Sequence, residues 1–449
     1  MDFIPPVAQP LLLTFAATFT RPTFQRWLLL CVAAILTPGQ RTITNLLRTV
    51  NVLVSGHPCS YHRVFSHRRW TVWGLGYALA SFILTHWVPQ GPVSLAGDDT
   101  VEEHPGRKVF GKARHRDPVR SSHTFTAWRW GHKWVVLAIV VQFPFTRRPW
   151  ALPVLVALYR SPEWNTKHGQ RHKTPAALLR QLVASLIHWF PQRPFRLAGD
   201  GSYGTHDLAR FAHRYRRHLT LVSRFYAAAN LYAPPPARSA QPKAGRPRTK
   251  GVKLPAPQQV VGRAKRRRLR VRWYGGTTRH VAVVSEMAHW YKGGQGLVPL
   301  RWVFVHDLSG THRDEYFFTT TPALSPKQII ELYTGRWSLE TTFQELRAYL
   351  GLETTRGWTQ ATVLRAAPCL FGLFSLVALL YAQLPPCHTR GVQVTWVGKQ
   401  DVTFSDALTA VRRWVWHDWI FVMCGHQDAF TKLPDSLRNI LLYALAPAA

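Results

Sequence analysis

The stretch YTGRWSLETTFQELR, residues 333–347, places Tyr333, Arg336, Glu340 and Arg347 at offsets of 0, 3, 7 and 14. At about 100° per residue, these four positions fall within roughly 60° of one another on a helix. A tyrosine, two arginines and one carboxylate on a single stripe have the chemistry to grip a phosphodiester and to hold a metal ion. This pattern makes the stretch the first candidate for a functional site.

The start of this helix is marked in the sequence. Ser325 is the expected N-cap, Pro326 stands at the first helical position, and Gln328 completes a capping box. Gly335 weakens the helix interior and leaves two alternatives open. Either the helix continues, or it breaks just before Trp337, in which case the tyrosine leaves the shared stripe and the other three residues need only small adjustments.

Acidic residues are scarce in this chain, and their positions are therefore informative. The sequence holds 57 Lys and Arg against 22 Asp and Glu, a formal charge of +35. An isolated carboxylate in so positive a chain is either a structural ion-pair partner or a cation ligand. Asp98 and Asp200 each follow the same apolar letters, in VSLAGD and FRLAGD. Both are expected at or near the end of a short strand, with Asp99 as an alternative to Asp98.

The charge balance predicts a polyanionic partner, with nucleic acid ahead of an anionic membrane surface. From residue 208 to 285 there are 19 Lys or Arg and no acid, and seven of the ten residues from 263 to 272 are basic. A solvated linker or surface hairpin is the alternative for that run. We expect DNA contacts from Arg263, Lys265, Arg266, Arg267, Arg268, Arg270 and Arg272.

Composition and periodicity predict a mixed α/β chain with several segments. Apolar β-rich runs at 134–143 and 151–160 predict strands, and their alternation with helical patterns indicates a mixed sheet flanked by helices. The expected divisions are a helical DNA-binding domain (1–90), a first part of the core (91–232), a basic linker with a β-rich insertion (233–320), a second part of the core with the Glu340 helix (321–384) and a C-terminal helical region (385–449).

One uncharged run, residues 366–384, is 19 residues long and could span a bilayer. Its proline, glycine and glutamine, and the lack of a second such run, favour a buried helix of a protein without membrane attachment. Five scattered cysteines fit a reducing cytoplasm.

The 333–347 stretch resembles the DDE transposases of bacterial insertion sequences, in the subgroup with the signature Y-x2-R-x3-E-x6-K. Tyr333, Arg336 and Glu340 match it, and Arg347 stands where that family usually has lysine. The arginine keeps the charge but changes the geometry of a phosphate contact. The resemblance covers roughly residues 93–384.

The two aspartates fit the same resemblance. Asp98-Asp99-Thr100 matches the Asp-x-Thr motif of the subgroup, with Asp98 as the catalytic residue, and Asp200 in LAGDGSYG matches the second motif. Asp99 stays open as the alternative first ligand.

This resemblance implies a ribonuclease H-like fold with a β-rich insertion and an N-terminal helical domain. It implies that Asp98, Asp200 and Glu340 are catalytic and hold two Mg²⁺ ions, with Mn²⁺ able to substitute. It also implies phosphate contacts from Tyr333, Arg336 and Arg347, and a flipped base held by an insertion aromatic, for which Tyr316 is the nearest match.

The expected function is cut-and-paste DNA transposition, with cleavage at transposon ends and strand transfer to target DNA. The implied partners are double-stranded DNA, as terminal inverted repeats and target, and a second copy of the chain in a homodimer. The implied location is the bacterial cytoplasm, at the nucleoid. Two alternatives stay open: a transposase-derived DNA-binding protein that does not cut, and a ribonuclease H-like nuclease.

Overall fold

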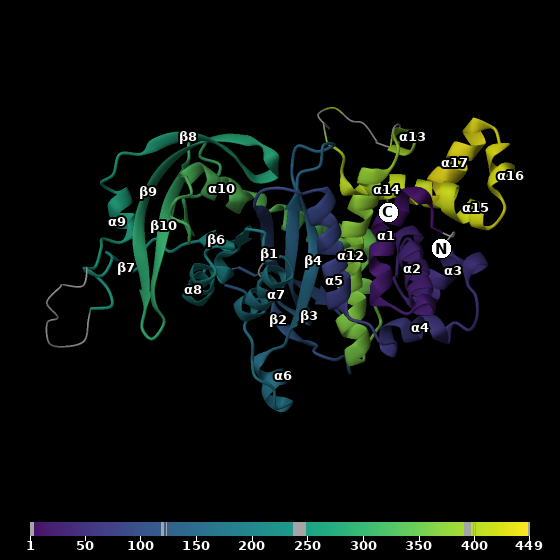
Figure 1. Cartoon of the computed structure of the whole chain (residues 1–449), viewed down its shortest axis with the longest axis horizontal. Coiled ribbons are helices and arrows are strands. Elements are labelled where there is room, and N and C mark those ends of the chain that lie inside the picture. Colours follow the sequence, from purple (N-terminus) through teal and green to yellow (C-terminus); the bar gives the residue numbers. More distant parts are fainter. Residues whose placement is uncertain are drawn as a thin grey trace.

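The computed structural model of the chain describes residues 4–117, 121–122, 124–236, 248–389, 397, 399 and 401–447. Within these residues, 11 strands form one mixed sheet in the order β2-β3-β1-β5-β6-β11-β10-β9-β7, with β4 added beside β3 and β8 beside β9 (Figure 1). The predicted mixed sheet flanked by helices is confirmed. The strands are β1 (Val93–Glu103), β2 (Ala113–Arg116), β3 (Trp128–Val141), β4 (Trp150–Tyr159), β5 (Phe195–Gly199), β6 (Leu219–Arg224), β7 (Leu231–Tyr232), β8 (Arg267–Arg272), β9 (Thr278–Lys292), β10 (Gly296–Asp307) and β11 (Glu315–Thr319).

Helices cover the sheet and form a separate group beside one end of it. In Figure 1 the helices of both chain ends lie together on the right, around the long helix α12. The helices are α1 (Gln9–Leu12), α2 (Arg21–Leu36), α3 (Ile43–Thr49), α4 (Cys59–Ser66), α5 (Val72–His86), α6 (Pro162–Lys167), α7 (Pro175–Trp189), α8 (His206–Arg214), α9 (Pro257–Val261), α10 (Pro326–Gly335), α11 (Ser338–Leu350), α12 (Gln360–Gln383), α13 (Pro386–Thr389), α14 (Phe404–Trp414), α15 (Phe421–Met423), α16 (Gln427–Thr431) and α17 (Asp435–Leu445).

Helix α12 contains the uncharged run noted in the sequence. In the described residues it is the one helix long and apolar enough to cross a membrane, and 67% of its most apolar window is buried inside the protein. Its side chains contribute Leu373, Phe374 and Val377 to a core shared with β4 and the N-terminal helices. This packing is that of the central helix of a protein core.

The two LAGD segments lie side by side at the centre of the sheet. β1 and β5 are parallel, with Gly97 opposite Gly199. β5 ends there, so Asp200 follows the strand as expected. For Asp98 the expectation of a strand end is wrong, because β3 continues to pair with β1 as far as Glu103. Asp98 and Asp200 nevertheless each follow one residue of the pair Gly97 and Gly199, so they lie at the same level of the sheet.

The β-rich insertion is antiparallel, as predicted, but it is not separate from the core. β11 pairs with β6, and β10 and β9 continue outward from it. The insertion therefore extends the same sheet and forms its left part in Figure 1. Part of the predicted basic linker, residues 237–247, lies outside the described residues.

The predicted helix start and the predicted break are both present. Ser325 caps α10 and forms the capping box with Gln328. The helix ends at Gly335, and α11 begins at Ser338. Between them, the amide of Arg336 bonds to the carbonyl of Tyr333 at 3.2 Å, a shortened i to i−3 turn. This tight turn places Arg336 between two helices, facing the sheet.

Gly335 offers a test of whether this junction needs glycine. A Cβ added at Gly335 meets no atom within 4 Å, so Gly335→Ala should raise the free energy of unfolding by about 0.5–1 kcal/mol. The matched change Gly351→Ala should lower it, because Gly351 has φ of +62° and its added Cβ would lie 2.7 Å from Thr354 Oγ1. Thermal and urea unfolding measure both. A loss of stability in Gly335→Ala would show that the junction requires a flexible backbone.

Candidate active site

Three carboxylates from separate elements converge on one guanidinium. Arg336 Nη1 bonds to Asp98 Oδ2, and its Nη2 lies 2.8 Å from Glu340 Oε1 and 3.8 Å from Asp200 Oδ1. Asp98 comes from the middle of β1, Asp200 from the end of β5, and Glu340 from the first turn of α11. The structure thus brings together the three acids that the sequence singled out.

The cluster is closed on the inside and open on the outside. The side chain of Arg336 is 5% exposed and that of Asp98 is 14% exposed, whereas Asp200 and Glu340 are 38% and 43% exposed. A ligand from solvent therefore meets Asp200 and Glu340 first, with Asp98 behind them.

The pKa of Asp98 is shifted by this arrangement. Burial raises the pKa of its carboxyl to about 7; Arg336 opposes that rise, and the neighbouring carboxylates of Asp99 and Asp200 add to it. One guanidinium facing three carboxylates leaves an excess of negative charge, which is an environment that favours an additional cation.

Asp99 points away from the cluster. Its carboxylate pairs with Lys133 Nζ at 2.7 Å and accepts a hydrogen bond from the Tyr203 hydroxyl at 3.0 Å. Successive residues of a strand face opposite sides, so Asp98 and Asp99 cannot both reach Arg336. Of the two alternatives left open by the sequence, the position beside Asp200 and Glu340 belongs to Asp98.

Tyr333 is completely buried, contrary to the expectation of a residue that faces DNA. Its hydroxyl lies 3.4 Å from Asp200 Oδ1 and donates to it, and its ring packs on Phe317 with 4.3 Å between the centroids. Arg336 lies over the same ring at 5.5 Å. In this structure Tyr333 contacts the acids and their arginine.

Arg347 also contacts protein groups. It donates to the Thr100 hydroxyl and, at 3.2 Å, to the carbonyl of Val101, and its Nε lies 3.3 Å from Glu353 Oε1. These bonds tie α11 to β1 directly beyond Asp98. A phosphate contact by Arg347 stays a prediction, and its present contacts fix the helix that carries Glu340.

Residues of the insertion that the sequence did not single out support the site. Glu315 on β11 binds the guanidinium of Arg224 and accepts a hydrogen bond from the Tyr274 hydroxyl at 3.2 Å. Arg224 in turn lies over the ring of Tyr333 at 5.9 Å. Contacts therefore run from the insertion through Arg224 and Tyr333 to Asp200.

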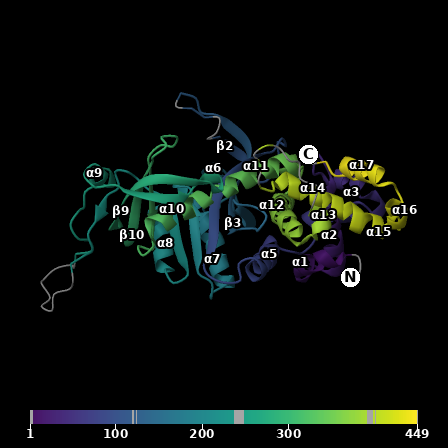
Figure 2. The same ribbon diagram turned by 90° about the horizontal axis from the view of Figure 1, so that it is seen from above.

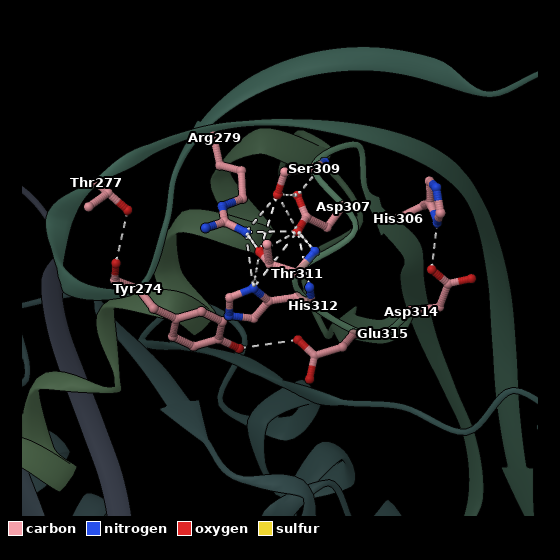
Figure 3. Close-up of polar contacts among 10 residues, drawn as sticks. All are labelled: Tyr274, Thr277, Arg279, His306, Asp307, Ser309, Thr311, His312, Asp314 and Glu315. Atoms are coloured by element: carbon pink, nitrogen blue, oxygen red, sulfur yellow. Dashed lines mark hydrogen bonds and ion pairs between the residues drawn. The ribbon is translucent and has the colours of Figure 1, made fainter.

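The turn before Glu315 is held by one buried aspartate (Figure 3). Asp307 accepts hydrogen bonds from the hydroxyl of Ser309 and from the amides of Thr311 and His312, and it pairs with Arg279 at 2.7 Å. These bonds outweigh burial and hold the pKa of Asp307 well below its usual range. The ordered turn fixes where β11 begins, and so where Glu315 stands.

The basic run differs from the buried cluster, because its side chains lie at the surface, with Arg266 stacked on the Phe304 ring at 5.3 Å. All seven basic residues between 263 and 272 are exposed and form no ion pair within the described part of the chain. Arg267–Arg272 form β8, which among the described residues pairs with β9 alone. Their placement fits the predicted contact with a polyanion.

Tyr316 is not brought to the acids. It packs on Phe304, with 5.1 Å between the ring centroids, while the next residue, Phe317, faces Tyr333 from the opposite side of the strand. Strand alternation therefore turns Tyr316 away from the cluster, and the sequence match that suggested it as a base-holding residue is not supported.

The acids fit a divalent cation by their chemistry. Carboxylate oxygens are the ligands that Mg²⁺ prefers, and the cluster has negative charge in excess of Arg336. As arranged, with Arg336 between them, no three His, Cys, Asp or Glu side chains of the described residues form a group ready to hold a metal ion. A bound cation would have to share the carboxylates with Arg336.

A family model described as DDE superfamily endonuclease matches residues 14–280, more than half of the chain. The chain belongs to this family. The match includes Asp98 and Asp200 and ends before Glu340. Enzymes of this family generally use divalent metal ions, and the DDE-type endonuclease chemistry in the prediction is confirmed at this level.

Two further comparisons add little. A search of curated proteins found no significant match. Among solved structures, the piggyBac transposase synaptic complex with hairpin DNA aligns over 99% of this chain and 84% of that chain, with 12% identity and a TM-score of 0.42. A likeness at this level carries no argument about function.

Glu102, four residues beyond Asp98 on β1, is a second buried carboxyl. It is 1% exposed, and it accepts hydrogen bonds from Trp134 Nε1 at 2.6 Å and from the Thr355 hydroxyl at 3.3 Å. Burial raises its pKa from 4.5 to about 8, although both hydrogen bonds oppose the rise. The folded chain therefore keeps a proton on Glu102 that the unfolded chain releases.

This difference predicts a pH dependence of stability. The contribution of Glu102 is full below pH 4.5 and is lost as the pH rises toward 8, by at most about 1.4 kcal/mol per pH unit. Glu102→Gln should remove that loss, so its stability relative to wild type should rise between pH 5 and pH 8. Urea unfolding of both proteins at pH 5, 6.5 and 8 measures the difference, and parallel pH profiles would contradict the prediction.

Proposed function

We propose that this transposase excises a DNA element by metal-dependent cleavage at its ends and inserts it by strand transfer, with Asp98, Asp200 and Glu340 as the catalytic acids. The observation that carries the proposal is the convergence of these three carboxylates at one partly exposed cluster. Acids that meet from two neighbouring parallel strands and a following helix, in a chain of such positive charge, support metal-dependent cleavage of a polyanion.

The strand order supports a ribonuclease H-like catalytic core. Within the sheet, β4, β3, β1, β5 and β6 are neighbours in that order; β3 is antiparallel to β1, and β5 and β6 are parallel to it. In this arrangement Asp98 lies on β1 and Asp200 directly follows the neighbouring strand β5, while Glu340 comes from α11. The insertion begins after β6 and returns to the core before α10.

The acids would hold two Mg²⁺ ions, with Mn²⁺ able to replace them. When bound, such ions activate the attacking oxygen and stabilise the leaving 3′ oxygen of a phosphodiester. The chain itself orients the acids: Tyr333 holds Asp200 by its hydroxyl, and Lys133 and Tyr203 anchor β1 through Asp99. Arg336 offsets part of the negative charge of the cluster, and through its contact with Glu340 it would lie beside a phosphate bound there.

The partners follow from the same resemblance. The DNA would be the terminal inverted repeats and the target of a bacterial insertion sequence, bound by two copies of the chain. The N-terminal helices would read the repeats, and the exposed side chains of β8 would hold the backbone. The bacterial nucleoid is the corresponding location.

Cleavage by single-residue variants tests the catalytic assignment. Wild-type protein with Mg²⁺ should nick a duplex that carries the terminal repeat of the element, at the repeat boundary. Asp98→Asn and Glu340→Gln should reduce the rate by at least about a thousandfold, since each removes a metal-binding oxygen. Asp99→Asn, which faces the other side of β1, should retain most cleavage. A denaturing gel resolves the strands.

Two outcomes would contradict the assignment. Retained cleavage in Glu340→Gln would remove that residue from the site. If Asp99→Asn and Asp98→Asn lost cleavage equally, with both proteins folded and bound to DNA, the loss would come from a disturbance of strand β1. It would then not show that Asp98 holds a metal ion.

The basic strand generates a separate prediction. Replacing Arg267, Arg268 and Arg270 by Gln should weaken DNA binding and reduce the slope of log K against log salt by about 0.9 for each phosphate that the variant no longer binds. The control replaces Arg214, Arg216 and Arg217, which are also exposed and carry the same charge. Fluorescence anisotropy over a salt series measures both. Equal changes in the two variants would show that the effect comes from the lower net charge of the protein, and would refute a DNA contact at β8.

A further inference from the structure

The hairpin formed by β2 and the start of β3 projects from the body of the protein (Figure 2). Its strands pair Arg114 with Trp130 and Arg116 with Trp128. All four residues are exposed, and Trp128 and Trp130 are 49% and 60% exposed. We call these four residues the Trp–Arg face.

The opposite face of the hairpin holds it in place. His115 and Asp117 are buried there, and Arg129 lies 2.7 Å from Asp117 and 3.2 Å from Glu103. The acids of the hairpin are therefore on the inner side, and the Trp–Arg face presents only cations and aromatic rings. This exposure follows from strand alternation: successive side chains point to opposite faces, so the residues between those of the Trp–Arg face lie on the inner face.

The Trp–Arg face lies on the same side of the sheet as the acid cluster. Asp98 is the register partner of Val136 on β3, and Trp130 precedes Val136 by an even number of residues. At about 3.3 Å per residue, Trp130 lies about 20 Å from the level of Asp98. That distance corresponds to about six base pairs of DNA.

The chemistry of this face matches unpaired bases. Aromatic side chains stack on bases, and neighbouring arginines contact the phosphates. Trp128 and Trp130 are two residues apart on one strand, about 6.6 Å, which is close to twice the rise of stacked bases. The guanidinium of Arg114 already lies over the Trp128 ring at 4.8 Å, so this ring accepts a flat cationic partner.

We propose that the Trp–Arg face binds unpaired bases of DNA whose phosphodiester lies at the acid cluster. This inference rests on the proposed function, because it needs DNA at Asp98, Asp200 and Glu340. A second copy of the chain is a poorer occupant, since an identical face would place arginine against arginine. In a continuous duplex, neighbouring bases cover both ring faces, so stacking here requires a separated strand.

The experiment uses the full chain and a duplex of arbitrary sequence with one forked end, in EDTA, with 2-aminopurine in the fork. The fully paired duplex is the second substrate. Trp128→Ala/Trp130→Ala should bind the fork at least about fivefold more weakly than wild type and should not quench 2-aminopurine. Binding of the paired duplex should stay within about twofold, and Trp128→Phe/Trp130→Phe should keep most of the quenching.

The control is Tyr443→Ala on α17, an aromatic ring that is 49% exposed and also lies under an arginine, Arg413 at 4.5 Å. It should bind both substrates like wild type. Unchanged fork binding by the double alanine variant, or an equal loss on fork and paired duplex, would overturn the proposal.

A parallel sample with Mg²⁺ and the terminal repeat separates the two hypotheses. Absence of cleavage by wild type there counts against the proposed function. If Trp128→Ala/Trp130→Ala binds the fork as tightly as wild type, that result counts against the Trp–Arg face, whether or not wild type cleaves.

Discussion

The contact of Arg336 with Asp98, Asp200 and Glu340 is the interaction on which the rest of the site depends. The three acids come from a strand, a strand end and a helix, and a buried guanidinium holds them together. Without that charge, three carboxylates would face one another in a partly desolvated space, and breaking a buried ion pair of this kind costs about 3–5 kcal/mol. The break between α10 and α11 serves this contact, because it turns Arg336 toward the sheet.

The same contact also affects how a cation can bind to the acids. Arg336 offers one positive charge to three acids, and burial raises the pKa of Asp98 even though Arg336 opposes that rise. Asp200 and Glu340 are the exposed members, so a cation meets them first and competes with Nη2 of Arg336. Binding of a metal ion and rearrangement of Arg336 are therefore coupled: the free energy gained by the ion includes the free energy of moving the guanidinium.

Local patterns predicted the elements of this site better than its contacts. The cap at Ser325, the break after Gly335 and the two LAGD strands follow from short-range rules. Spacing also placed Tyr333, Arg336 and Glu340 near one another, but it said nothing about what they face, so the burial of Tyr333 and the bonds of Arg347 to β1 were missed. The pairing of β11 with β6 joins residues 93 positions apart or more, and no local pattern encodes it. The start of β3 escaped for another reason: exposed Trp and Arg alternate there, whereas the apolar run begins only at Trp134.

Strand β3 connects the acid cluster to the hairpin without interruption. It pairs with β1 at every residue from Asp98 to Glu103 and with β2 from Gly131 to Trp128. The distance between the acids and the Trp–Arg face is therefore fixed by backbone hydrogen bonds, and substitutions on the exposed face change its chemistry while leaving that distance intact. Under the two proposals above, the sheet would act as a rigid spacer that sets the interval between a phosphodiester at the acids and separated bases at the Trp–Arg face.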